Sequence, residues 1–70
     1  MSKQYWTGDV GQDDDFNEPI DDTFYDGKTA MGPWAIMAPR SWRRFCGRVG
    51  LGVAQKYEKQ DDGRWLKVEG

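Results

Sequence analysis

The feature that most constrains this chain is its lack of the side chains that usually staple small domains. It has 70 residues, one cysteine (Cys46) and no histidine. One thiol cannot form an intramolecular disulfide, and a zinc site needs four Cys, His or carboxylate ligands. A chain this short buries only about 60% of the surface that its unfolded form exposes. Burial of large side chains must therefore supply most of the stabilisation.

Aromatic residues are the side chains available for this purpose. The chain has four Trp, three Tyr and three Phe, and each of them can bury a large area. We expect Trp6, Phe24, Trp34 and Trp65 to supply much of the core. The sequence shows no long apolar run and no charged-then-apolar leader, so it predicts a soluble intracellular protein without membrane contact.

Charge divides the chain into two parts. Residues 1–26 carry one lysine and eight acidic side chains, whereas residues 27–70 carry nine basic and four acidic side chains. The length predicts a single domain, residues 1–70, with an acidic N-terminal strand and loop followed by a basic part. Such an asymmetric molecule can orient itself in the electric field of a partner.

Local signals predict two hairpins and one helix. Asp26-Gly27 and Asp62-Gly63 are typical of two-residue turns, which need a positive φ. Between them, Pro39 to Cys46 is expected to form a short helix, with Ser41 as a possible N-cap and Gly47 at its C-terminal end. The glycine-rich "GRVGLGV" that follows lacks the ending of a phosphate-binding loop and predicts a turn.

The segments "DGKTAMGPWAIM" and "GLGVAQKY" resemble a family of small zinc-ribbon or treble-clef-like proteins encoded by bacteriophages. The resemblance covers roughly residues 6–70. The local signals predict an α+β mini-domain with two β-hairpins and one short helix, and the resemblance implies a treble-clef-like or zinc-ribbon-like arrangement of these elements. In the register of this family, two Cys-x-x-Cys zinc-binding pairs would fall at Asp13 and Phe16 and at Ala38 and Ser41.

All four of these ligand positions are replaced, and Cys46 lies outside the register. We therefore expect a treble-clef-like fold without metal, in which Phe16 and Ala38 meet as a hydrophobic plug at the former site. The acidic run lacks the glycine-centred spacing of a calcium loop. No cofactor is predicted.

Catalysis is not expected from this set of side chains. No histidine is present to serve as a general base, and the carboxylates gather in one run instead of facing each other across a cleft. The sequence therefore predicts a protein that is not an enzyme and that acts by binding.

The acidic run is the first candidate binding surface, because a concentrated negative patch can occupy a basic channel on another protein. The alternative is a loop that only gives solubility. The phage resemblance implies expression in the cytoplasm of an infected bacterium. The predicted function is inhibition or modulation of a host protein or nucleoprotein machine (polymerase, nuclease or defence complex) by surface occlusion. The partner-binding residues would be Asp13, Asp14, Asp15, Glu18, Asp21 and Asp22.

Two other functions remain open. Arginines interleaved with aromatics are typical of nucleic-acid binding, in which a ring stacks on a base and guanidinium groups contact phosphates. This site would comprise Arg40, Trp42, Arg43, Arg44 and Arg48. Trp42 and Phe45, three residues apart, could instead pin the helix to the core. The third possibility is a minor structural component of the virion.

Overall fold

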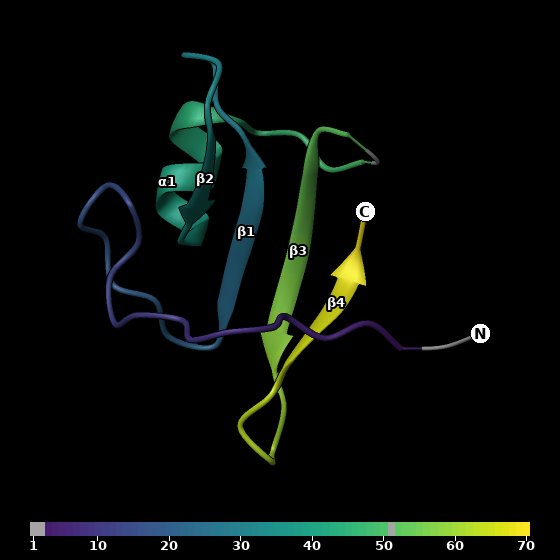
Figure 1. The fold of residues 1–70 in the computed structure, drawn as a ribbon. Coiled ribbons are helices and arrows are strands. Elements are labelled where there is room, and N and C mark those ends of the chain that lie inside the picture. Colours follow the sequence, from purple (N-terminus) through teal and green to yellow (C-terminus); the bar gives the residue numbers. More distant parts are fainter. Residues whose placement is uncertain (1–2, 51) are drawn as a thin grey trace.

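The computed structural model describes residues 3–50 and 52–70, which form one antiparallel sheet and one short helix (Figure 1). Leu51, within the glycine-rich segment, and residues 1–2 lie outside the described residues. The strands lie in the order β2-β1-β3-β4. The elements are β1 Thr23–Lys28, β2 Trp34–Met37, α1 Pro39–Phe45, β3 Ala54–Lys59 and β4 Trp65–Glu69. The predicted α+β class with a short helix is confirmed, and the treble-clef arrangement stays a prediction.

The two faces of the sheet bury different aromatic groups, because adjacent residues of a strand point to opposite faces. Tyr25 of β1 stacks on Trp42 of α1, with ring centroids 4.2 Å apart and planes 7° from parallel. On the other face, Phe24 lies 5.3 Å from Trp6, 5.0 Å from Tyr57 and 5.0 Å from Trp65. Figure 1 shows α1 behind the sheet and the N-terminal segment crossing in front of it.

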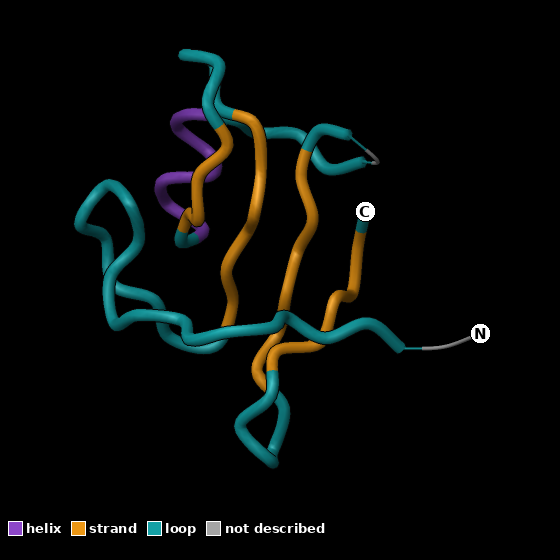
Figure 2. Tube along the Cα trace, in the orientation of Figure 1, coloured by secondary structure: helices purple, strands orange, loops and turns teal. Residues whose placement is uncertain are grey.

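The N-terminal segment is loop over residues 3–22 (Figure 2), yet it is hydrogen-bonded to the sheet. At the β4 edge, Trp6 N donates to Trp65 O at 2.9 Å, and Lys67 N donates to Gln4 O at 2.8 Å. The strand predicted near Tyr5 is thus reduced to a single bridge with Leu66. This pairing covers part of an edge that would otherwise expose free backbone groups.

The turn predicted at Asp26-Gly27 is wrong, because both residues lie inside β1. The chain reverses instead over residues 29–33, where the backbone N and the Oγ1 of Thr29 both donate to Pro33 O. Gly27 is buried, and a Cβ built on it would lie 2.5 Å from the Cβ of Ala54 on β3. Glycine is required there by the close approach of two strands and not by a turn.

The helix and the second hairpin follow the local signals more closely. Gly47 follows α1 with a φ of 71°, and Gly63 has a φ of 89°, so both have the predicted positive φ. The reversal between β3 and β4 is longer than the predicted two-residue turn: it spans residues 60–64, and Gln60 N donates to Arg64 O at 2.7 Å. The predicted N-cap is wrong: Ala38 is the N-cap residue, and Ser41 lies buried within the helix. Pro39 fixes the opening turn without a side-chain cap. In the described part of the chain, no helix has the length and apolar character needed to cross a membrane.

Substitution of Gly27 tests the close approach of β1 and β3. We expect Gly27→Ala to lower the free energy of unfolding by about 1–3 kcal/mol, because the added methyl group overlaps Ala54. Urea unfolding measures the change. Replacement of Ala54 by Gly in the same chain should recover part of the loss. Gly11→Ala, whose Cβ would meet its nearest atom at 3.5 Å, is the control; equal losses at both glycines would contradict the packing argument.

Candidate binding surfaces

Asp14 is the most constrained acidic residue of the chain. It is only 6% exposed. Its Oδ1 accepts hydrogen bonds from Phe16 N at 2.8 Å and Glu18 N at 2.9 Å, and its Oδ2 accepts one from Ala38 N at 2.7 Å. The first two bonds close the acidic loop on itself, and the third ties this loop to the junction between β2 and α1.

Asp15 continues this attachment along the outer edge of β2. Its Oδ2 accepts from Ile36 N at 2.9 Å, and its own N donates to Ile36 O at 3.1 Å. The backbone N and O of Ile36 and the backbone N of Ala38 are therefore paired with the acidic loop. We call Asp14 and Asp15 the aspartate clamp. It takes the place of a further strand at this edge of the sheet.

Two opposing effects act on the pKa of Asp14. Burial alone would raise it, whereas the nearby Ser41 hydroxyl and the backbone donors of Glu18, Ala38 and Phe16 favour the charged form and together lower the pKa below 3.8. Ser41 Oγ is buried and makes no hydrogen bond of good geometry with any described residue. We therefore attribute the stabilisation of the Asp14 carboxylate mainly to the three backbone N–H groups and not to the Ser41 hydroxyl.

The clamp lies where the resemblance would place a metal. The segment around Asp13 and Phe16 meets the segment around Ala38 and Ser41, and Phe16 stacks on Phe45 with ring centroids 4.1 Å apart. The Phe16 ring thus packs on the last residue of α1, whereas Ala38 is the N-cap residue at the other end of the helix. The predicted contact between Phe16 and Ala38 stays a prediction. Within residues 3–50 and 52–70, no three His, Cys, Asp or Glu side chains are grouped as a metal would require.

The remainder of the acidic run forms an exposed surface. Asp14 is not part of it, because it is buried, and Asp15 has one oxygen bound to Ile36. Glu18 is half-buried and lies 3.9 Å from Arg40. We call the three exposed side chains that remain the acidic triad: Asp13, Asp21 and Asp22.

The predicted nucleic-acid site on the helix is only partly available. The guanidinium groups belong to exposed residues, namely Arg40, Arg43, Arg44 and Arg48. Trp42, however, is half-buried, has one ring face against Tyr25 and donates its Nε1 to Arg48 O at 2.9 Å. Trp42 therefore packs between α1 and β1, as the alternative interpretation expected, and does not offer a free ring on that side.

Trp34, which was expected in the core, is instead 46% exposed. It opens β2 directly after the turn that carries Met31, which is 67% exposed. Its cross-strand partner is Lys28, so both side chains lie on the same face of the sheet. Sequence reasoning missed this surface because the first turn was placed at Asp26-Gly27, which shifted the strand boundaries.

We expect Asp14→Ala to be the most destabilising substitution in the acidic run. It removes the acceptor of three backbone N–H groups, one of them buried, and a loss of about 2–4 kcal/mol follows. For a domain of this size the melting temperature should fall by roughly 10–25 °C. Asp13→Ala, at the exposed neighbouring position, is the control and should melt near the wild type. Similar melting of both variants would contradict the clamp.

Stability should also depend on pH through Asp14. Because its pKa is lower in the folded than in the unfolded chain, its contribution is complete well above pH 3.8 and is lost as pH falls through the folded-state pKa. The difference in unfolding free energy between wild type and Asp14→Asn should therefore shrink below about pH 4. Urea unfolding from pH 2 to pH 7 measures it. A difference independent of pH would show that the charge of Asp14 does not stabilise the fold.

Comparison with known proteins gives no family for this chain. No family model, curated protein or solved structure matches it.

Proposed function

We propose that the chain is a non-enzymatic binding protein that occludes a basic surface on a partner protein through its acidic loop. The observation that carries the proposal is the fixed presentation of the acidic triad. The partner would be a protein or nucleoprotein machine of a bacterial host, as the phage resemblance implies. The chain would modulate this partner in the bacterial cytoplasm.

The acidic loop is held by its own backbone as well as by Asp14. Ile20 N donates to Gln12 O at 2.7 Å, Asp14 N donates to Glu18 O at 2.8 Å, and Asp13 forms a bridge with Pro19. Figure 1 shows this loop projecting beside α1, away from β3 and β4. A loop ordered before binding loses less conformational entropy in a complex than a flexible acidic tail would.

Within the acidic run, some carboxylates bind the fold and others face solvent. Asp14 and Asp15 bind the edge of β2, so they hold the loop in place. The acidic triad faces solvent and is free to contact arginine or lysine side chains of a partner. Charge complementarity of this kind mainly accelerates encounter and selects the partner. We therefore expect affinity to weaken with increasing salt.

The test is pull-down from a nuclease-treated bacterial lysate, followed by affinity measurement with the captured protein. A variant with Asp13→Asn, Asp21→Asn and Asp22→Asn should bind at least about tenfold more weakly at low salt. The matched control carries Asp9→Asn, Asp61→Asn and Glu69→Gln, which remove the same number of charges from exposed positions elsewhere. Equal weakening in both variants, or none in the first, would contradict the proposal.

A further inference from the structure

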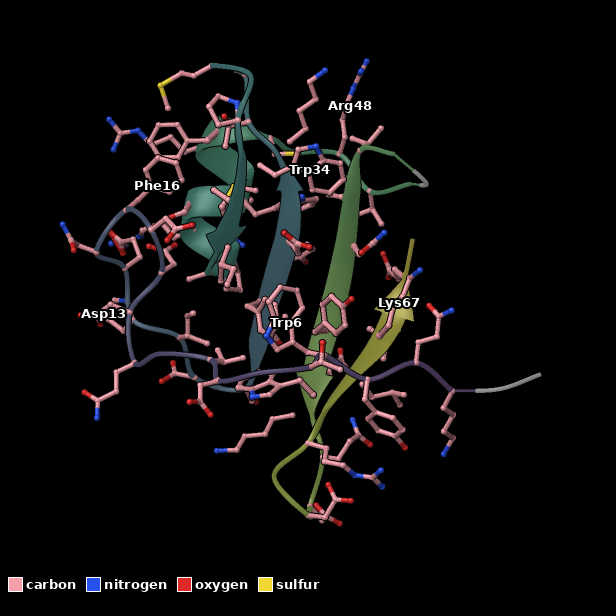
Figure 3. The ribbon with its side chains drawn as sticks, viewed as in Figure 1. Trp6, Asp13, Phe16, Trp34, Arg48 and Lys67 are labelled. Carbon is pink, nitrogen blue, oxygen red and sulfur yellow. The ribbon has the colours of Figure 1, made fainter. Side chains whose placement is uncertain are left out.

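The end of the sheet that carries Trp34 has a composition opposite to that of the acidic loop. Lys28 and Arg48 line one pocket near the C-terminal end of α1. Its other lining residues are Thr29, Ala30, Phe45, Cys46, Gly52 and Val53. No acidic residue lines this pocket among the residues that the structure describes. Figure 3 shows Trp34 and Arg48 at the same end of the molecule, with Asp13 far from both. Trp34 does not line the pocket itself, but Lys28, which does, is its cross-strand partner.

The sheet face at this end is also uncovered. Helix α1 packs on the Tyr25 face, whereas Lys28 and Trp34 lie on the opposite face, which also carries Phe24. Trp6 covers Phe24 on that opposite face. Trp34 lies beyond this cover and remains 46% exposed. A half-exposed tryptophan on a rigid strand is a ready surface for stacking.

We propose that Trp34, Lys28 and Arg48 bind single-stranded nucleic acid, with a base stacked on the Trp34 ring and the phosphates next to it bound by Lys28 and Arg48. Binding of single strands without sequence preference needs these two parts, an aromatic platform and cations that follow the backbone. Lys28 stands opposite Trp34 in the strand register, so the two parts lie about 5 Å apart at their Cβ atoms. The cationic pocket favours a polyanion over an apolar peptide as the occupant.

One carboxylate limits the extent of this site. Asp26 lies on the same sheet face as Lys28, two residues earlier in β1, and pairs with Ile36 and Gln55. Its charge repels phosphates, so the strand of nucleic acid runs on the side of Lys28 and Arg48, away from Asp26. Removing this charge should strengthen binding, which gives the proposal a gain-of-affinity test.

The experiment is fluorescence polarisation with a labelled oligo-dT, using the full chain at 50 and 200 mM salt. Trp34→Ala should weaken binding at least about fivefold through lost stacking, and Trp34→Phe should recover part of the loss. Lys28→Gln and Arg48→Gln should each reduce the slope of log affinity against log salt by about 0.7. Asp26→Asn should tighten binding, and a duplex of the same length should bind more weakly than the single strand.

Lys59→Gln is the matched control, because it removes one exposed positive charge outside this pocket. Thermal melting shows whether each variant is folded. Unchanged affinity in folded Trp34→Ala, or an equal loss in Lys59→Gln, would overturn the proposal. It would also be overturned if the wild type bound no oligo-dT. If Trp34→Ala then lost binding to a captured protein, Trp34 would be a contact residue for a protein partner. Loss of oligo-dT binding with the acidic triad intact leaves the proposed protein-binding function standing, so the two can fail separately.

Discussion

The hydrogen bonds from backbone amides to the Asp14 carboxylate hold together two parts of the chain that are distant in sequence. Asp14 accepts from Ala38 across 24 positions, and this bond fixes the acidic loop against the start of α1. Hydrogen bonds to a charged acceptor contribute about 1.5–3 kcal/mol each. A domain of this length is stable by only about 4–10 kcal/mol. The Asp14 side chain thus supplies a large part of the free energy of unfolding. It also fixes the position of the exposed aspartates next to it.

The aspartate clamp joins a loop to the start of a helix. In many small domains a metal ion makes this connection. It is weaker than structural zinc, for which apparent binding free energies are about 10–16 kcal/mol in finger peptides. The remaining stabilisation comes from aromatic packing on both faces of the sheet, with Tyr25 against Trp42 and Phe24 among Trp6, Tyr57 and Trp65. Phe16, next to the clamp in sequence, adds a third contact by stacking on Phe45 at the end of α1.

Some signals that act over a few residues predict the structure correctly, although the N-cap predicted at Ser41 is wrong. Features that depend on distant neighbours are not predicted. Gly63 and Gly47 have the positive φ that their local context predicts. Asp26-Gly27 carries the same turn signal as Asp62-Gly63, but Gly27 faces Ala54 in a neighbouring strand, and no local pattern reveals that contact. The three consecutive aspartates likewise look equivalent in sequence. Only the fold shows that Asp14 is buried and that Asp13 is not. Trp34 was misplaced for the same reason, since its burial depends on which strands flank it.

The charge asymmetry of the sequence is only partly a spatial separation in the structure. Arg40 of α1 lies 3.9 Å from Glu18 of the acidic loop, whereas Lys28 and Arg48 line a pocket that has no acidic residue among those that the structure describes. Everything in this arrangement depends on the acidic loop being bound to β2. Native-state hydrogen exchange at the Ala38 and Ile36 amides tests that binding most directly. The account predicts that both amides exchange as slowly as the amides paired between β1 and β3, because opening them requires release of the clamp. Fast exchange at both, as at an uncovered sheet edge, would contradict it.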